Sequence, residues 1–265
     1  KASRGLGDVY KRQTKKTKYM IFKGKNMDDI SENFNIRINN SVLGKIGDKC
    51  ETKSYKFVGV LLDENISWDH QINHVSNKIS SGLFALNQVK NILPPNIMIM
   101  VYNSLIKCHL EYACIAWASS CSKNLDKITK LQKKAVRIIS NSNYNAHTDP
   151  IFGKLNILKF EDLVDSKIYE FISKFLLNKL PSTFSNVFKQ LNSTRSKNLR
   201  CEVPIAKYLE KFPSVLFPKK WNSLGNALKT SKSEKSLKRN FKKQTVNRYK
   251  SFKCSKRKCF VCKKS

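Results

Sequence analysis

Apolar residues recur every three or four positions from Ile72 to Val89. This spacing places them on one face of an α-helix, and it differs from the alternation of a β-strand. The Pro94-Pro95 pair that follows is a signal for the helix to end. A long amphipathic helix after Trp68 is therefore the element that most constrains the fold.

Three later stretches carry the same spacing, and they are residues 97–117, 124–139 and 160–176. A proline lies in each of the short connections that we expect around these helices, namely Pro94, Pro150 and Pro181. Amphipathic helices that follow one another through short loops bury their apolar faces against each other. The sequence therefore predicts a packed helical bundle for this part of the chain.

The chain before Trp68 reads as β-structure. Residues 19–22, YMIF, form a short apolar run, and residues 34–46 alternate in polarity before an Asn-Asn-Ser turn, which predicts a hairpin. Residues 55–63, YKFVGVLLD, predict a strand with a glycine inside it, where another backbone or a ligand approaches closely. The expected fold class is mainly α with a small β element: an N-terminal β-hairpin region, a helical bundle and a basic tail.

The charge balance points to polyanions as partners. The chain holds 51 lysines and arginines against 19 acidic residues, a formal net charge of +32. This exceeds what solubility requires. The basic residues are spread along the whole chain and not confined to one amphipathic stretch, which favours nucleic acid over an anionic membrane. A merely basic surface remains the alternative.

One predicted helix, residues 124–139, carries a basic row beside its apolar one. The basic row is Lys127, Lys130, Lys134 and Arg137, and the apolar row one residue later is Ile128, Leu131, Ala135 and Ile138. One residue is about 100° around a helix, so the basic row lies beside the buried face, where it could meet phosphates. An ordinary solvated face is the alternative.

The last segment changes character from residue 229. Residues 229–265 hold 15 lysines and arginines against one acidic residue, with few aliphatic side chains, so we expect a flexible basic tail. Cys254, Cys259 and Cys262 lie within it at C-x4-C-x2-C spacing. Zinc prefers four ligands and this set offers three, so we expect a basic tail with free thiols, and the remnant of a zinc site is the alternative.

The remaining bulk features predict an intracellular protein, in the cytoplasm or nucleus. No window of about 18 apolar residues is present for a membrane span. The first residues, KASRGLGDVYKRQ, lack the apolar core of a secretory signal. The other cysteines are scattered without the spacing of a disulfide framework. We therefore expect no transmembrane segment and no secretion.

Residues 16–22, KTKYMIF, are similar to the motif that follows the catalytic aspartates in the reverse transcriptases of jockey-like non-LTR retrotransposons. They are the first of three groups of residues that resemble these enzymes in order and spacing. Residues 57–63, FVGVLLD, with Ile66-Ser67-Trp68 and His70, resemble the primer-grip hairpin and the start of the thumb. The third group looks like thumb and tail segments: Tyr102, Leu110-Glu111-Tyr112, Trp117, Leu131-Gln132, residues 135–139 and Trp221-Asn222-Ser223-Leu224.

The resemblance covers roughly residues 14–245 and implies the C-terminal fragment of an RNA-directed DNA polymerase. It implies that Lys16 lies near the triphosphate as a proton donor and that the hairpin with Phe57, Gly59 and Leu61 holds the primer end. It places Trp68 where the thumb begins. The implied partners are an RNA or DNA template–primer and the upstream palm and fingers of the parent polypeptide. Packing is the alternative role for Phe57, Gly59 and Trp68, and Lys16 also reads as one more lysine in a basic run.

The catalytic aspartates of the family are expected to be absent. Nucleotidyl transfer needs carboxylates that hold two metal ions. Met27-Asp28-Asp29 mimics the aromatic-x-Asp-Asp motif, but no aromatic residue precedes it, and it follows the lysine motif where the family has it before. We expect a surface loop there, no enzymatic activity and no cofactor, with Mg²⁺ needed only by the full-length enzyme.

The resulting division has four parts. Residues 1–13 match no part of the family and read as a foreign junction, residues 14–66 as a palm remnant, residues 67–228 as a thumb-like region and residues 229–265 as the tail. Two other functions stay open, a stand-alone basic nucleic-acid-binding module and a helical interaction protein. The salt dependence of nucleic-acid binding separates the interaction protein, which should bind little at any salt, from the other two.

Overall fold

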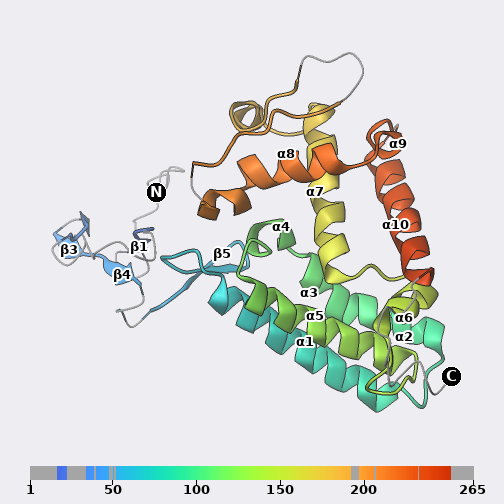
Figure 1. The fold of residues 1–265 in the computed structure, drawn as a ribbon. Coiled ribbons are helices and arrows are strands. Elements are labelled where there is room, and N and C mark those ends of the chain that lie inside the picture. Colours follow the sequence, from blue (N-terminus) through green and yellow to red (C-terminus); the bar gives the residue numbers. More distant parts are fainter. Residues whose placement is uncertain are drawn as a thin grey trace, which may run out of the picture. The chain divides into compact units, whose positions relative to one another are not determined.

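The computed structural model describes residues 17–22, 34–38, 40–47, 50, 52–191, 197–205, 207–231 and 233–251. The chain divides into two compact units, Lys1–Asn73 and His74–Ser265, which we call the N-terminal and C-terminal units. Helices dominate the described residues and the sheets have two strands each, so the predicted fold class, mainly α with a small β element, is confirmed (Figure 1).

Among the residues that the structure describes, the N-terminal unit has three two-stranded sheets. Their pairs are β1 (Lys18–Met20) with β4 (Gly44–Ile46), parallel, and β2 (Arg37–Ile38) with β3 (Ser41–Val42) and β5 (Tyr55–Phe57) with β6 (Val60–Leu62), both antiparallel. The hairpin predicted within residues 34–46 is confirmed by β2 and β3. The parallel pair β1–β4 joins segments far apart in the sequence, and no local sequence pattern predicts such a pairing.

The single strand predicted over residues 55–63 is wrong, because the segment folds back on itself. Val58 and Gly59 connect β5 to β6, and both have positive φ angles, 46° and 79°. Two central residues with positive φ match the twist of the flanking strands, which is why short hairpins use such turns. Gly59 is therefore part of the turn, and it does not mark a place where another backbone or a ligand approaches a strand.

The C-terminal unit is helical. Its α-helices, with α1 beginning just before the division, are α1 (Asp69–Val89), α2 (Pro95–Tyr102), α3 (Cys108–Glu111), α4 (Cys114–Trp117), α5 (Ser122–Ile139), α6 (Thr148–Leu155), α7 (Phe160–Leu176), α8 (Pro213–Ser223), α9 (Asn226–Lys229) and α10 (Glu234–Lys250). A π-helical segment, Asn103–Lys107, joins α2 to α3, and 3-10 segments lie at Ser182–Asn186 and Lys207–Lys211. The helices predicted after Trp68 and over residues 124–139 and 160–176 are confirmed as α1, α5 and α7.

The continuous helix predicted over residues 97–117 is wrong, because the backbone breaks twice. The π-helical segment widens the helix by its longer hydrogen-bond spacing. Tyr112 is then extended and Ala113 is left-handed, with φ 49°, so α4 starts in a new direction. The indole Nε1 of Trp117 donates to the Tyr112 carbonyl at 2.9 Å and fixes this break.

Two further expectations are corrected. Pro150 lies within the first turn of α6 and not in a loop, because the first amides of a helix have no acceptor and a proline loses nothing there. Residues 234–250, expected within a flexible tail, form α10, whose buried side chains include Leu237, Phe241 and Tyr249. With the buried Thr245, these residues recur every four positions along one face, and the many lysines between them hide the pattern.

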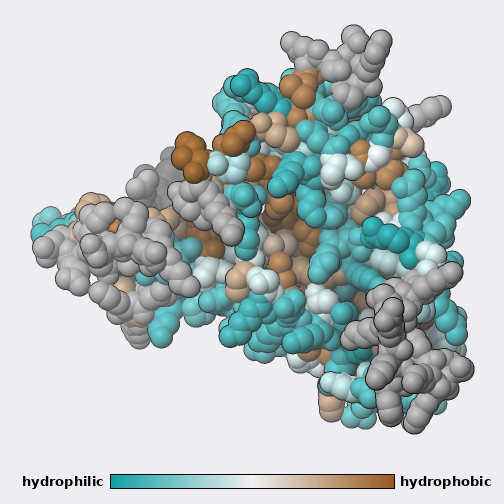
Figure 2. All heavy atoms as spheres, in the orientation of Figure 1, coloured by the Kyte–Doolittle hydropathy of each residue, from teal (hydrophilic) through white to brown (hydrophobic). Residues whose placement is uncertain are grey.

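An aromatic core holds the C-terminal unit together. Phe188, Phe217, Trp221 and Tyr169 are all buried in one cluster that draws on α7, α8 and α10. Figure 1 shows α8 crossing α7, and α7 packs against both α8 and α10. A second buried contact stacks Trp117 on Phe160, with ring centroids 5.2 Å apart. Hydrophilic residues cover most of the visible face of this unit, and hydrophobic residues show in a hollow at its middle (Figure 2).

Candidate nucleic-acid interface

A buried carboxylate organises the N-terminal unit around the β5–β6 hairpin. Asp63 is 2% exposed, and its Oδ1 accepts hydrogen bonds from the backbone amides of Asn65 at 3.2 Å and Ser67 at 2.9 Å. Its Oδ2 accepts from the Ser67 hydroxyl at 3.2 Å and the Trp68 amide at 3.1 Å. Ile66 and Trp68 have positive φ angles of 50° and 66°, which side chains of their size rarely adopt. The hydrogen bonds of Asp63 therefore stabilise a strained turn that leads into α1.

The hairpin is fixed to the start of α1 but leaves its tip in solvent. The Leu61 amide donates to Gln71 Oε1 at 2.9 Å, which joins β6 to the first turns of α1. Phe57 and Val58 remain 60% and 72% exposed. Exposed apolar side chains on an anchored turn offer a surface on which bases and sugars can stack.

The hairpin residues singled out from the sequence therefore differ in their surroundings. Phe57 and Gly59 lie at the exposed tip. Leu61 is half-buried within β6, and Trp68 is buried at 8% exposure. Of these four residues, only Phe57 and Gly59 are exposed to solvent.

On α5, the predicted basic row divides in two. Lys127, Lys130 and Lys134 are exposed on one side of the helix, and we call them the α5 lysine row. Arg137 is half-buried, and its Nε and Nη2 both donate to the Ala146 carbonyl, at 3.1 and 3.0 Å. Its guanidinium also lies 5.8 Å from the centre of the Tyr144 ring. Arg137 thus holds the loop after α5, while the three lysines face solvent.

The buried face of α5 is rotated from the one predicted. Leu131 and Ile138 are only half-buried, while Gln132, Val136 and Ile139 are buried together with the expected Ile128 and Ala135. The prediction was wrong for Leu131 and Ile138 because it followed the aliphatic residues and passed over a glutamine. The rotation moves the α5 lysine row further from the core.

Gln132 belongs to the group that resembles thumb segments, but its role in the core was not predicted from the sequence. Its side chain is fully buried, and Nε2 donates to the Tyr102 hydroxyl and to the Leu158 carbonyl, each at 2.9 Å. Its Oε1 accepts from the Phe160 amide at 2.7 Å, one of the first amides of α7, which have no acceptor within the helix. Burial raises the pKa of Tyr102, so the phenol stays neutral. The glutamine therefore fixes α5 against α2 and α7 and sets the direction of the lysine row.

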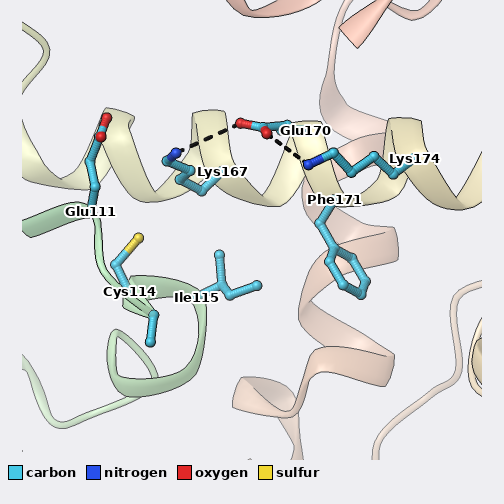
Figure 3. Close-up of a pocket in the computed structure, with 8 residues that line it drawn as sticks. Glu111, Cys114, Ile115, Lys167, Glu170, Phe171 and Lys174 are labelled. Carbon is cyan, nitrogen blue, oxygen red and sulfur yellow. Dashed lines mark hydrogen bonds and ion pairs between the residues drawn. The ribbon is translucent and has the colours of Figure 1, made fainter. Parts of the chain in front are cut away.

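A pocket of about 190 Å³ lies beside α4 and α7 (Figure 3). Glu170 lies between Lys167, at 3.8 Å, and Lys174, at 2.9 Å. Burial by itself would raise the pKa of Glu170, but the hydrogen bond from Lys174 and the charge of Lys167 lower it overall. Burial raises the pKa of the Cys114 thiol to about 12, so it stays protonated at neutral pH. This pocket is charge-balanced and offers no activated nucleophile.

Several residues of interest lie outside the described part of the chain: Lys16, Asp28, Asp29, Cys254, Cys259 and Cys262. Within the described ranges, no group of three or more His, Cys, Asp or Glu side chains is placed to hold a metal ion. None of the helices described has both the length and the apolar character needed to cross a membrane.

Comparison with known proteins gives one relative with a bearing on function. The chain is 26% identical over 143 residues to the RNA-directed DNA polymerase from mobile element jockey of Drosophila funebris. The match covers 53% of this chain and 14% of the relative, so the chain corresponds to a small part of that protein's length. No family model and no solved structure matches. The similarity supports a relationship to reverse transcriptases.

Proposed function

We propose that this chain is a C-terminal piece of the RNA-directed DNA polymerase of a jockey-like non-LTR retrotransposon and that it binds template–primer without reading its sequence. The similarity to the jockey enzyme supports the parentage. The order of a β-hairpin and then a helical unit agrees with the end of a palm followed by a thumb. The observation that carries the binding role is the α5 lysine row, Lys127, Lys130 and Lys134.

The lysine row suits the phosphates of a nucleic-acid strand. From Lys127 to Lys134 the helix rises about 10 Å, at about 1.5 Å per residue. This is about three nucleotide steps of a B-form strand, at about 3.4 Å each. Lysines that neutralise phosphates release condensed counterions, and such contacts carry no sequence information. Gln132 keeps the helix that bears the row fixed in the core.

The hairpin supplies the second proposed contact, with the primer end. Phe57 and Val58 offer apolar atoms at the tip, and Asp63 and Gln71 hold the strands behind them. The proposed roles of Leu61 and Trp68 are indirect, because Leu61 is half-buried within β6 and Trp68 is buried. They position the hairpin and the turn into α1.

Metal-dependent nucleotidyl transfer is assigned to the palm and fingers of the parent polypeptide, which are the proposed protein partners. Met27-Asp28-Asp29 lacks the preceding aromatic residue of the catalytic motif. The Mg²⁺ ions of the reaction, and the carboxylates that hold them, would therefore come from those partners. The role proposed for this chain is binding.

Fluorescence anisotropy with a labelled RNA–DNA primer–template, across a range of salt concentrations, tests the proposal. We expect the triple variant K127Q/K130Q/K134Q to bind all sequences more weakly, with a slope of log K against log salt that is flatter by about one per lysine. The matched control K189Q/K219Q/K235Q removes the same charge from exposed lysines outside the row. An equal loss in both variants would mean that total charge, and not the row, governs binding.

The alternatives give different results in the same assay. A helical interaction protein would bind the primer–template weakly at every salt concentration. A stand-alone basic module would bind a blunt duplex as well as a primer–template junction. We expect a preference for the junction, and we expect Phe57→Ala to remove that preference while leaving the binding of blunt duplex unchanged.

A further inference from the structure

A second cavity, of about 340 Å³, lies within the C-terminal unit, apart from the α5 lysine row. Its walls come from α2, the π-helical segment, α3, residues 155–158, α7 and α10. Four lysines line it, Lys107, Lys167, Lys238 and Lys242, against one carboxylate, Glu111. The rest of its wall is largely apolar and includes Leu155, Ile157 and Leu163.

The positive charge in this cavity is only partly neutralised. Lys107 lies 3.7 Å from Glu111, and Lys167 lies 3.8 Å from Glu170, which Lys174 also shares. Lys238 and Lys242 form no hydrogen bond or ion pair with the described residues. Burial, and then the charges of Lys107 and Lys238, lower the pKa of Lys242. Cations gathered in a partly buried space disfavour one another unless an anion joins them.

A polar atom without a partner lies in the same wall. Ser166 is 5% exposed and lines the cavity, and its Oγ has no hydrogen-bond partner in the described structure. Buried hydroxyls are satisfied in most proteins, and an unsatisfied one at a cavity is a donor that a ligand oxygen can use. This observation is independent of the lysine charges and points to the same space.

The pocket of Figure 3 shows what a balanced arrangement looks like in this fold. There Glu170 lies between Lys167 and Lys174, and Glu111 lines the same pocket, so two carboxylates share the space with two ammonium groups. The larger cavity has four lysines against one carboxylate. A ligand that neutralises it must carry more than one negative charge and several acceptor oxygens.

We propose that this cavity binds a phosphate group, with Lys107, Lys238 and Lys242 as its cationic ligands and Ser166 as a hydroxyl donor. A phosphate supplies up to two charges and three acceptor oxygens, which ammonium groups bind through charge-assisted hydrogen bonds. The apolar wall gives room to the group that carries the phosphate. The phosphate can belong to a free phosphorylated compound or to a nucleic-acid strand. Neither source involves the α5 lysine row, so the site goes beyond the function proposed above.

Isothermal titration calorimetry of the full chain with inorganic pyrophosphate tests the site. We expect K238Q/K242Q to bind pyrophosphate about 100-fold more weakly, since each charged hydrogen bond contributes about a factor of ten. The matched control K235Q/K243Q removes the same charge from exposed positions of α10 that do not line the cavity, and it should bind like the parent chain. Ser166→Ala, which breaks no hydrogen bond of the described structure, should weaken binding severalfold without lowering the melting temperature.

A second arm identifies the source of the phosphate. Unlabelled single-stranded oligonucleotide replaces pyrophosphate in the same titrations. Loss of pyrophosphate affinity in K238Q/K242Q alone supports a free phosphorylated ligand, and loss of oligonucleotide affinity beyond that of K235Q/K243Q supports a strand phosphate. Equal binding by K238Q/K242Q and K235Q/K243Q of both probes would overturn the proposal. The α5 variant K127Q/K130Q/K134Q should keep its pyrophosphate affinity. The experiments therefore test the phosphate site independently of the α5 lysine row.

Discussion

The two units are held in shape by different forces. In the N-terminal unit, the four hydrogen bonds of the Asp63 carboxylate organise the turn between β6 and α1, while Phe57 and Val58 stay exposed. In the C-terminal unit, aromatic side chains such as Trp221 and Phe217 are buried among helices distant in sequence. Loss of one charged hydrogen bond costs about 1.5–3 kcal/mol, and loss of a buried aromatic side chain about 3–5 kcal/mol.

The contrast teaches where each unit tolerates change. A defect at Asp63 should remain local, because the groups that it contacts lie within five residues of it. A defect at Trp221 should spread, since its contacts join α7 and the segment near Lys197. Four substitutions test this difference between the two units, from the largest expected effect to the smallest.

Trp221→Ala should lower the free energy of unfolding of the C-terminal unit by about 3–5 kcal/mol. It removes a fully buried indole from the core and leaves the Lys197 carbonyl without its donor at 2.7 Å. Urea denaturation followed by circular dichroism measures the loss. Ile205→Ala, at a side chain that is 98% exposed, should change stability by less than about 0.5 kcal/mol. A small effect of Trp221→Ala would show that burial does not hold this unit together.

Gln132→Ala should cost about 2–4 kcal/mol, because it strips partners from the buried Phe160 amide and Tyr102 hydroxyl and from the carbonyl of the half-buried Leu158. The same denaturation experiment measures it. Gln88→Ala is the matched control, at an exposed position of α1. Equal stability of the two variants would mean that α5 is positioned by apolar contacts alone. This outcome would also remove the reason given for the direction of the lysine row.

Asp63→Asn should loosen the hairpin region by about 1.5–3 kcal/mol while the melting of the helical unit stays unchanged. The amide NH₂ would face the Trp68 amide, which now donates to Oδ2, so two donors would meet. Hydrogen exchange measured by mass spectrometry should quicken over residues 60–72. Asp126→Asn, at an exposed position of α5, should leave that exchange as it is. A fall in the melting of the helical unit would break the comparison between the two units.

Val58→Asn should give the smallest effect, a stabilisation of the hairpin by about 1 kcal/mol. A β-branched residue at φ 46° is strained, and asparagine before glycine is the pair that such turns favour. Slower exchange of the amides in β5 and β6 is the measurement. Gly59→Ala, at φ 79°, should act in the opposite direction. Faster amide exchange in both variants would mean that the backbone at Val58 is not strained.

Much of the fold could be predicted from periodicity. The long helices α1, α5 and α7 were predicted from apolar residues at helical spacing. Helix α10 was not predicted, because lysines surround its four-residue repeat. Helix α6 was not predicted either, because it is short and contains a proline. The β1–β4 pair joins distant segments, so no local pattern could reveal it.

The candidate sites divide in the same way. The α5 lysine row lies on one helix, and its spacing in the sequence predicted its common face. The phosphate cavity brings Lys107, Ser166 and Lys242 together from three separate segments, and only the tertiary structure shows that they share a wall. The burial of Gln132 was not predicted, because a polar residue beside an apolar stripe is expected to face solvent.

Helix α10 also decides when this fold can form. It packs on α6 and α7, the Tyr249 hydroxyl donates to Asp162, and the Lys159 amide donates to that hydroxyl at 3.3 Å. During synthesis, α7 is complete at Leu176, long before Lys250 is added. At a synthesis rate of roughly 5–20 residues per second, the apolar face of α7 stays uncovered for about 4 to 15 s until α10 has been made. The growing chain is therefore open to chaperones, and to nucleic acid, before it is folded.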